Sequence, residues 1–161
     1  MNAMPIFDPK ANLISMISRS YDFLVKDLKA LPEEKQNVIF GGCTRTALDI
    51  VAECAATNQS MSLRLAGTPK AALSAEENAA ERAHYDTQDK VLAYLEETTS
   101  QLKNVISKMD PDTFSYTDPE FFNGAMCRYG MAELTGIHMM YHTGQLNYIQ
   151  MLLGDDKVHW R

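Results

Sequence analysis

Two histidines near the end of the sequence, His138 and His142, are the residues best suited to chemistry. They are four positions apart in a strongly helical segment, so both imidazoles project from one helix face, one turn apart, and can converge on one cation. Neutral imidazole suits zinc, nickel, iron and copper. The spacing predicts a divalent-metal site; the alternative is two partly buried histidines that hydrogen-bond to their neighbours.

Two further polar side chains, Tyr141 and Gln145, lie within one turn of these histidines. Each could orient a bound water or substrate, or hold a ligand ring through its second nitrogen. Tyr141 suits core packing equally well. Gln145 suits the core less, because a buried amide must find hydrogen-bond partners. We therefore predict catalytic roles for Gln145 and Tyr141.

Four helical segments must position these side chains, because apolar residues recur at intervals of three and four in each segment. Asp8 is a predicted N-cap, and Ser74 with Glu77 forms a predicted capping box. Glycine or proline follows the end of each segment. The segments run from about Pro9 to Ala30, from Cys43 or Thr44 to Gly67, from Ser74 to Met109 without a break, and from Met131 to Leu153.

The core face of the last segment is expected to carry Leu134, Ile137, Tyr141, Ile149 and Leu152. Residues 112–128, rich in aromatic and turn-forming types, are predicted to form a structured crossover between the third and fourth helices. Strand signals are almost absent. The sequence therefore predicts an all-α four-helix bundle that forms one domain over residues 1–161.

The string from His138 to Ile149, HMMYHTGQLNYI, resembles the last-helix signature of the DinB-like superfamily. The resemblance extends to the Gly154-Asp155-Asp156 turn and the closing His159-Trp160, and more loosely to the second helix. It implies a DinB-like four-helix bundle, a metal site and a homodimer.

The resemblance also implies a third ligand. In that family a further histidine, usually on the second helix, completes the metal site, but this chain has no histidine before His84. Placing the second helix against the family pattern puts Glu53 at or next to that position, with Cys54 and Asp49 as weaker candidates. Two histidines and a carboxylate bind zinc or ferrous iron and leave room for water or substrate. Alternatively, Glu53 is a solvated carboxylate on a helix face. His84 is expected at the surface.

Known members of the resembled family include metal-dependent transferases and isomerases that use low-molecular-weight thiols such as mycothiol or bacillithiol. The resemblance therefore implies a thiol-dependent S-transferase that acts on a small molecule. A metal-bound water would instead make the protein a hydrolase. The competing hypothesis is a non-catalytic bundle that has lost its metal and serves as a stress-related binding or dimerisation module.

The amino-acid composition bears on nucleic-acid binding, membrane association and the state of the cysteines. The chain has 15 basic and 21 acidic residues and a formal net charge of −6, which should repel phosphate backbones, so no nucleic-acid partner is expected. No run approaches the ~18 to 20 apolar residues that cross a bilayer, so no membrane association is expected. Three cysteines without a CxxC pair or a signal peptide predict small, buried, reduced thiols in the cytoplasm: Cys43, Cys54 and Cys127.

Overall fold

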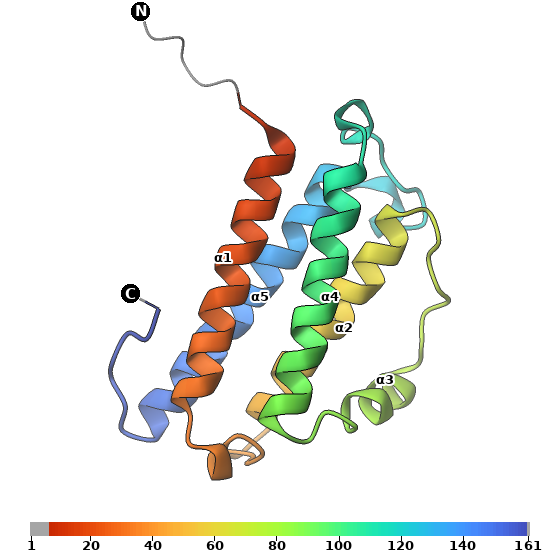
Figure 1. Cartoon of the computed structure of the whole chain (residues 1–161). Helices are drawn as coiled ribbons and strands as arrows, with labels where there is room; N and C mark the ends of the chain where they lie inside the picture. Colours follow the sequence, from red (N-terminus) through yellow and green to blue (C-terminus); the bar gives the residue numbers. More distant parts are fainter. Residues whose placement is uncertain (1–6, 161) are drawn as a thin grey trace, which may run out of the picture.

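The computed structural model describes residues 7–160. Four long helices lie side by side, α1 (Pro9–Ala30), α2 (Ala47–Leu65), α4 (Gln88–Lys108) and α5 (Arg128–Leu152), and a short helix α3 (Ala75–Arg82) lies beside them (Figure 1). Helices α1 and α2 each pack against both α4 and α5, so the order around the bundle is α1, α5, α2, α4. The predicted all-α four-helix bundle is confirmed.

Helix α1 follows its sequence signals. The Asp8 carboxylate accepts hydrogen bonds from the backbone N–H groups of Lys10 and Ala11, and Pro9 occupies the first helical position. These contacts satisfy donors that have no partner inside the helix. The helix ends where Leu31, which precedes a proline, turns extended. Both predicted ends of this helix are confirmed.

The predicted helix from Ser74 to Met109 is wrong in one respect, because the structure divides it into α3 and α4. The capping box of Ser74 and Glu77 does start α3. Helix α3 has no buried residue, whereas α4 buries a full apolar stripe. Thr87 then caps α4 by accepting a hydrogen bond from Lys90 N. A segment without an apolar face has little to bury against the bundle, so α3 turns away from the axis of α4.

Helix α2 begins at Ala47, three or four residues later than the predicted start at Thr44 or Cys43, after a loop. Gly41 and Gly42 have positive φ angles, and Thr46 caps the helix by accepting a hydrogen bond from Asp49 N at 3.1 Å. The loop leaves Cys43 exposed, and Cys127 is only half-buried as the N-cap of α5. The expectation of three buried cysteines therefore holds for Cys54 alone.

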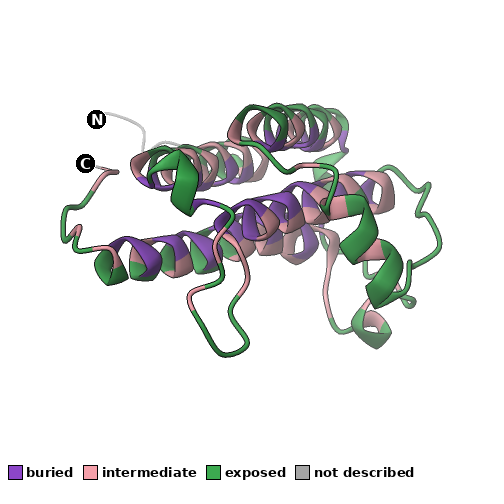
Figure 2. Ribbon diagram, turned by 90° about the horizontal axis from the view of Figure 1, so that it is seen from below, coloured by how far each residue is buried: buried purple, intermediate pink, exposed green. Residues whose placement is uncertain are grey.

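The core takes buried residues from all four long helices, and Figure 2 shows them on the facing sides of the bundle. On α5, Ile149 is buried as expected, but Ile137, Tyr141 and Leu152 are 53, 64 and 53 % exposed. The helix is rotated so that Met139, His142 and Leu146 face inward instead. Spacing alone therefore assigned Ile137, Tyr141 and Leu152 to the wrong side of this helix.

The crossover predicted at residues 112–128 is confirmed as an irregular segment between α4 and α5. It contains the short 3₁₀ turns Pro111–Thr113 and Phe122–Gly124 and an isolated bridge between Thr117 and Cys127. Arg128, the first residue of α5, donates to the backbone oxygen of Leu65 at the end of α2. In residues 7–160, no helix has the length and apolarity needed to cross a membrane.

Candidate metal centre

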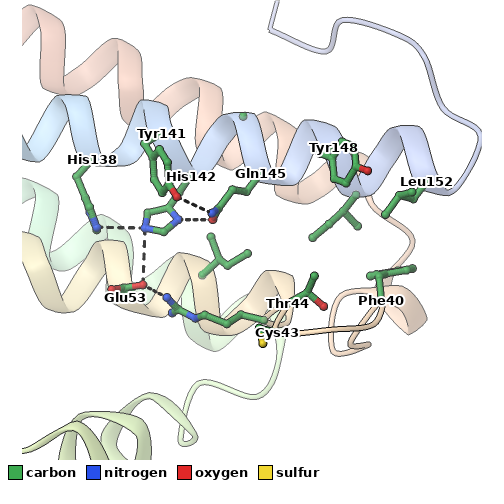
Figure 3. Close-up of a pocket in the computed structure, with 14 residues that line it drawn as sticks. Phe40, Cys43, Thr44, Glu53, His138, Tyr141, His142, Gln145, Tyr148 and Leu152 are labelled. Carbon is green, nitrogen blue, oxygen red and sulfur yellow. Dashed lines mark hydrogen bonds and ion pairs between the residues drawn. The ribbon is translucent and has the colours of Figure 1, made fainter.

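The rings of His138 and His142 approach each other edge to face on α5, with their Nε2 atoms 3.1 Å apart (Figure 3). Histidine nitrogens that share one tetrahedral zinc ion lie about 3.3 Å apart, because each Zn–N bond is about 2.0–2.1 Å long. His142 is only 4 % exposed, so water competes little for its ring. The spacing of the two nitrogens therefore fits a shared cation.

Gln145 determines which nitrogen of His142 faces this position. Its side-chain carbonyl oxygen lies 2.7 Å from His142 Nδ1, and its amide nitrogen donates to the hydroxyl of Tyr141 at 3.2 Å. A carbonyl oxygen only accepts, so Nδ1 carries the proton and the lone pair of Nε2 is turned towards His138. This is the tautomer that a metal ligand needs.

Burial keeps both rings neutral. Desolvation lowers the pKa of His138, and the neighbouring charge of protonated His142 lowers it further. Desolvation also lowers the pKa of His142. Histidine ligands must be deprotonated to bind a cation, so these shifts keep the pair competent to bind down to a lower pH than ordinary histidines.

Glu53 on α2 faces the histidine pair across the helix interface. Its Oε2 atom lies 3.6 Å from His142 Nε2 and also pairs with Arg45. Burial alone would raise the pKa of Glu53, but hydrogen bonding to Arg45 and its charge outweigh burial and lower the pKa. The carboxylate is therefore ionised, as a ligand must be.

Cys54 also approaches the pair, although the sequence ranked it below Glu53. Its Sγ atom and one nitrogen from each of His138 and His142 all lie within 4.8 Å of one another. The thiol is fully buried, and burial raises its pKa. Two imidazole nitrogens with an adjacent carboxylate or thiolate form a donor set that fits a divalent metal.

Asp49, the other weaker candidate, is engaged elsewhere. Arg45 Nε donates to its Oδ2 at 2.5 Å, and Arg82 of α3 donates to its Oδ1 at 2.6 Å. Burial would raise the pKa of Asp49, but hydrogen bonds from Arg82 and Arg45 outweigh it and lower the pKa. Asp49 thus anchors two arginines and does not line the pocket around the histidines.

The histidine pair lines a pocket of about 680 Å³ between α2, α5 and the loop before α2. Its volume is in the range of small-molecule sites, about 300–1,000 Å³. All five residues predicted for the site line it: Glu53, His138, Tyr141, His142 and Gln145. The other lining residues are Phe40, Cys43, Thr44, Arg45, Ile50, Gly144, Tyr148, Ile149 and Leu152.

The remaining histidines lie away from this pocket. His84 is exposed, as expected, and lines a separate polar pocket beside Tyr85 and Tyr94. His159 pairs with Asp155 at 2.8 Å near the C-terminal end. Arg45 is the charged pocket residue that the sequence analysis missed. Its spacing of four from Asp49, which places an arginine and a carboxylate together at a helix start, was the available signal.

Comparison with known proteins identifies the family of this chain. The sequence model of the DinB superfamily matches residues 16–146, from α1 to the last turns of α5. The chain belongs to the DinB superfamily. The resemblance seen in the sequence of α5 is thereby confirmed. A search of curated proteins found no match for this DinB chain.

Two solved structures share the DinB fold. A conserved protein from Enterococcus faecalis superposes with a TM-score of 0.76 at 10 % identity, over 93 % of this chain and 100 % of that protein. The colibactin self-resistance protein ClbS, solved in complex with dsDNA, superposes with a TM-score of 0.71 at 17 % identity, over 88 % of this chain and 95 % of that protein. At such low identity these likenesses establish the fold.

The ClbS complex corrects one expectation from the sequence. We excluded nucleic acid as a partner on the net charge of −6, but a protein of this fold is found with dsDNA. Net charge is a sum over the whole surface, whereas the local potential at one face governs contact with a phosphate backbone. The exclusion of nucleic acid is therefore wrong.

Proposed function

We propose that this DinB protein is a divalent-metal-dependent enzyme, a thiol-dependent S-transferase or a hydrolase, that uses zinc, nickel or iron. The proposed ligands are His138, His142 and Glu53. The observation that carries the proposal is the 3.1 Å separation of the two histidine Nε2 atoms at a pocket of about 680 Å³. Gln145 supports it, because its carbonyl oxygen holds the tautomer that frees Nε2 of His142.

Each proposed residue has a defined task. A bound divalent metal would supply Lewis acidity, which stabilises a thiolate or a hydroxide at neutral pH. Glu53 contributes a negative charge and a hard oxygen ligand. Gln145 positions His142 and holds the hydroxyl of Tyr141. Tyr141 lines the pocket, and its hydroxyl, which accepts a hydrogen bond from Gln145, would donate one to a substrate or leaving group.

Glu53 is preferred over Cys54 as the third ligand for two reasons. Glu53 lines the pocket and its carboxylate is ionised, because Arg45 lowers its pKa. Cys54 is fully buried and burial raises the pKa of its thiol, so forming the thiolate costs free energy. A Cys54→Ser variant should therefore keep most of its metal, whereas Glu53→Gln should lose most of it.

The first test is elemental analysis of the purified, untagged protein by plasma mass spectrometry. We expect near-stoichiometric metal in the wild type and its loss in the His138→Ala, His142→Ala double variant. His84→Ala is the matched control, because His84 is exposed and lies outside the pocket. No metal in the wild type, even after loading with zinc, nickel or iron, would contradict the proposal and favour a non-catalytic binding module.

A metal-containing protein should next be assayed in two ways. An S-transferase consumes a low-molecular-weight thiol together with an electrophile, and its product retains the thiol sulfur. A hydrolase turns over ester or amide substrates without added thiol. Loss of activity in Glu53→Gln and in the histidine double variant, with His84→Ala unaffected, would assign the activity to this centre.

A role that involves nucleic acid is the second candidate, because ClbS, a protein of the same fold, is found with dsDNA. Fluorescence anisotropy with a labelled duplex at about 50 and 200 mM salt tests it directly. Binding that weakens steeply with salt indicates phosphate contacts. If the duplex binds and no metal does, this second candidate replaces the enzyme proposal.

A further inference from the structure

Arg45 lies in the wall of the pocket beside the proposed metal ligands. Its guanidinium donates through Nε to Asp49 Oδ2 at 2.5 Å, through Nη2 to the Asp49 backbone oxygen at 3.0 Å, and through Nη1 to Glu53 Oε2. One third of the side chain, 33 %, remains exposed. Arg45 lines the pocket and Asp49 does not.

Asp49 holds the guanidinium of Arg45 independently of Glu53. Two of its three contacts go to Asp49, and Asp49 is fixed in turn by Arg82 of α3 at 2.6 Å. A planar guanidinium bound by two contacts to one residue keeps its orientation when its third contact changes. Its remaining edge, which carries Nη1, is therefore presented to the pocket beside Glu53 and the histidines.

The charges of this wall favour an anion once a cation is present. The positive charges of Arg45 and Arg82 balance the negative charges of Asp49 and Glu53. A divalent cation would leave the group with an excess of two positive charges. In addition, Glu53 Oε2 is both the oxygen nearest His142 and the partner of Arg45, so a cation competes with Arg45 for this oxygen.

The other end of the pocket is apolar. Phe40 from the loop before α2 and Tyr148 and Leu152 from the last turns of α5 line it, on the side farther from the histidines (Figure 3). Tyr148 and Leu152 are more than half exposed, so a bound apolar group would remove their surface from water. The pocket thus pairs a charged end with an apolar end.

We propose that the substrate of this pocket is a small organic anion with an apolar body: Arg45 binds the anionic group beside the metal ligands, and Phe40, Tyr148 and Leu152 contact the body. The proposal deepens the proposed function and rests on it for the role of the metal. Arg45 is then a specificity-determining residue, and Asp49 and Arg82 are positioning residues that hold its guanidinium.

Calorimetric titration of the zinc-loaded protein tests this, with 3-phenylpropionate, 4-phenylbutyrate and octanoate as probes and their neutral amides as matched ligands. We expect the carboxylates to bind about tenfold to hundredfold more tightly than the amides. Arg45→Gln should abolish this preference, and Arg45→Lys should keep part of it. Leu152→Ser should weaken the binding of carboxylates and amides equally, because this substitution alters only the apolar end of the pocket.

Arg64→Gln is the control variant, because Arg64 pairs with Asp118 at 2.5 Å outside this pocket. Metal content is measured on the same samples, and circular dichroism verifies folding. If metal binds but carboxylates and amides bind equally, or if Arg45→Gln keeps the preference, the substrate proposal is overturned while the metal centre stands. If no metal binds, an Arg45-dependent preference for carboxylates would uphold the substrate proposal alone, and its absence would overturn both.

Discussion

His142 Nδ1 and Gln145 Oε1 lie 2.7 Å apart, three residues apart on α5, and this contact turns the other nitrogen of His142 towards His138. The proposed metal centre thus depends on a residue that need not touch the metal. A hydrogen bond to the imidazole nitrogen that does not bind the metal fixes the tautomer and orientation of a metal-binding histidine.

Replacing Gln145 should therefore weaken metal binding without removing a ligand. We expect Gln145→Leu to lower zinc affinity about tenfold to hundredfold, because His142 loses the acceptor for its Nδ1 proton. Gln145→Glu keeps an acceptor oxygen and should retain most of the affinity. Competition with a chromophoric chelator measures both. Equal affinities for the two variants would show that Gln145 does not act through His142.

The carboxylate at position 53 can be tested by restoring the residue type expected from the superfamily. Glu53→His should raise metal affinity, because a third neutral imidazole replaces a carboxylate that Arg45 also binds. The same chelator competition measures the change. Unchanged or lower affinity would show that Glu53 does not occupy the position of the third ligand.

Removing Arg45 should shift metal and anion binding in opposite directions. The guanidinium repels a cation at the histidine pair and competes with it for Glu53 Oε2. We expect Arg45→Gln to raise zinc affinity about threefold to tenfold at low salt, while carboxylates bind more weakly and lose their preference over the amides. Arg64→Gln should change neither quantity. Metal and anion binding that fall together would instead indicate a general disruption of the pocket.

The metal-free protein should lose stability as the pH falls below neutral. Burial lowers the pKa of His138 and His142 from the ordinary value of 6.5. The unfolded chain therefore binds protons at a higher pH than the folded chain does. The stability that the neutral rings contribute is fully present above about pH 6.5, and the free energy of unfolding declines as the pH falls below that value. Urea unfolding at pH 7.5, 6.5 and 5.5 measures the decline.

The His138→Gln, His142→Gln double variant is the control for this pH dependence. It removes both titrating rings, so its free energy of unfolding should change less between pH 7.5 and 5.5 than that of the wild type. An equal decline in the two proteins would assign the pH dependence to other groups.

The sequence by itself determined the features that depend on neighbours along the chain. Asp8 and Pro9 start α1 because a cap contacts backbone groups two and three residues away. His138 and His142 share a face because the pitch of a helix fixes residues four apart. The all-α class and the superfamily followed from the same local patterns.

Only the tertiary structure decided the features that depend on how helices rotate and meet. The rotation of α5 exposes Ile137, Tyr141 and Leu152, because packing against α1 and α2 selects a face that spacing alone left ambiguous. It also brings Glu53 and Cys54 of α2 to the histidine pair. The contact of Arg45 with Glu53 arises where the loop before α2 folds back on that helix. Such contacts join side chains by position in space, which no periodicity in the sequence encodes.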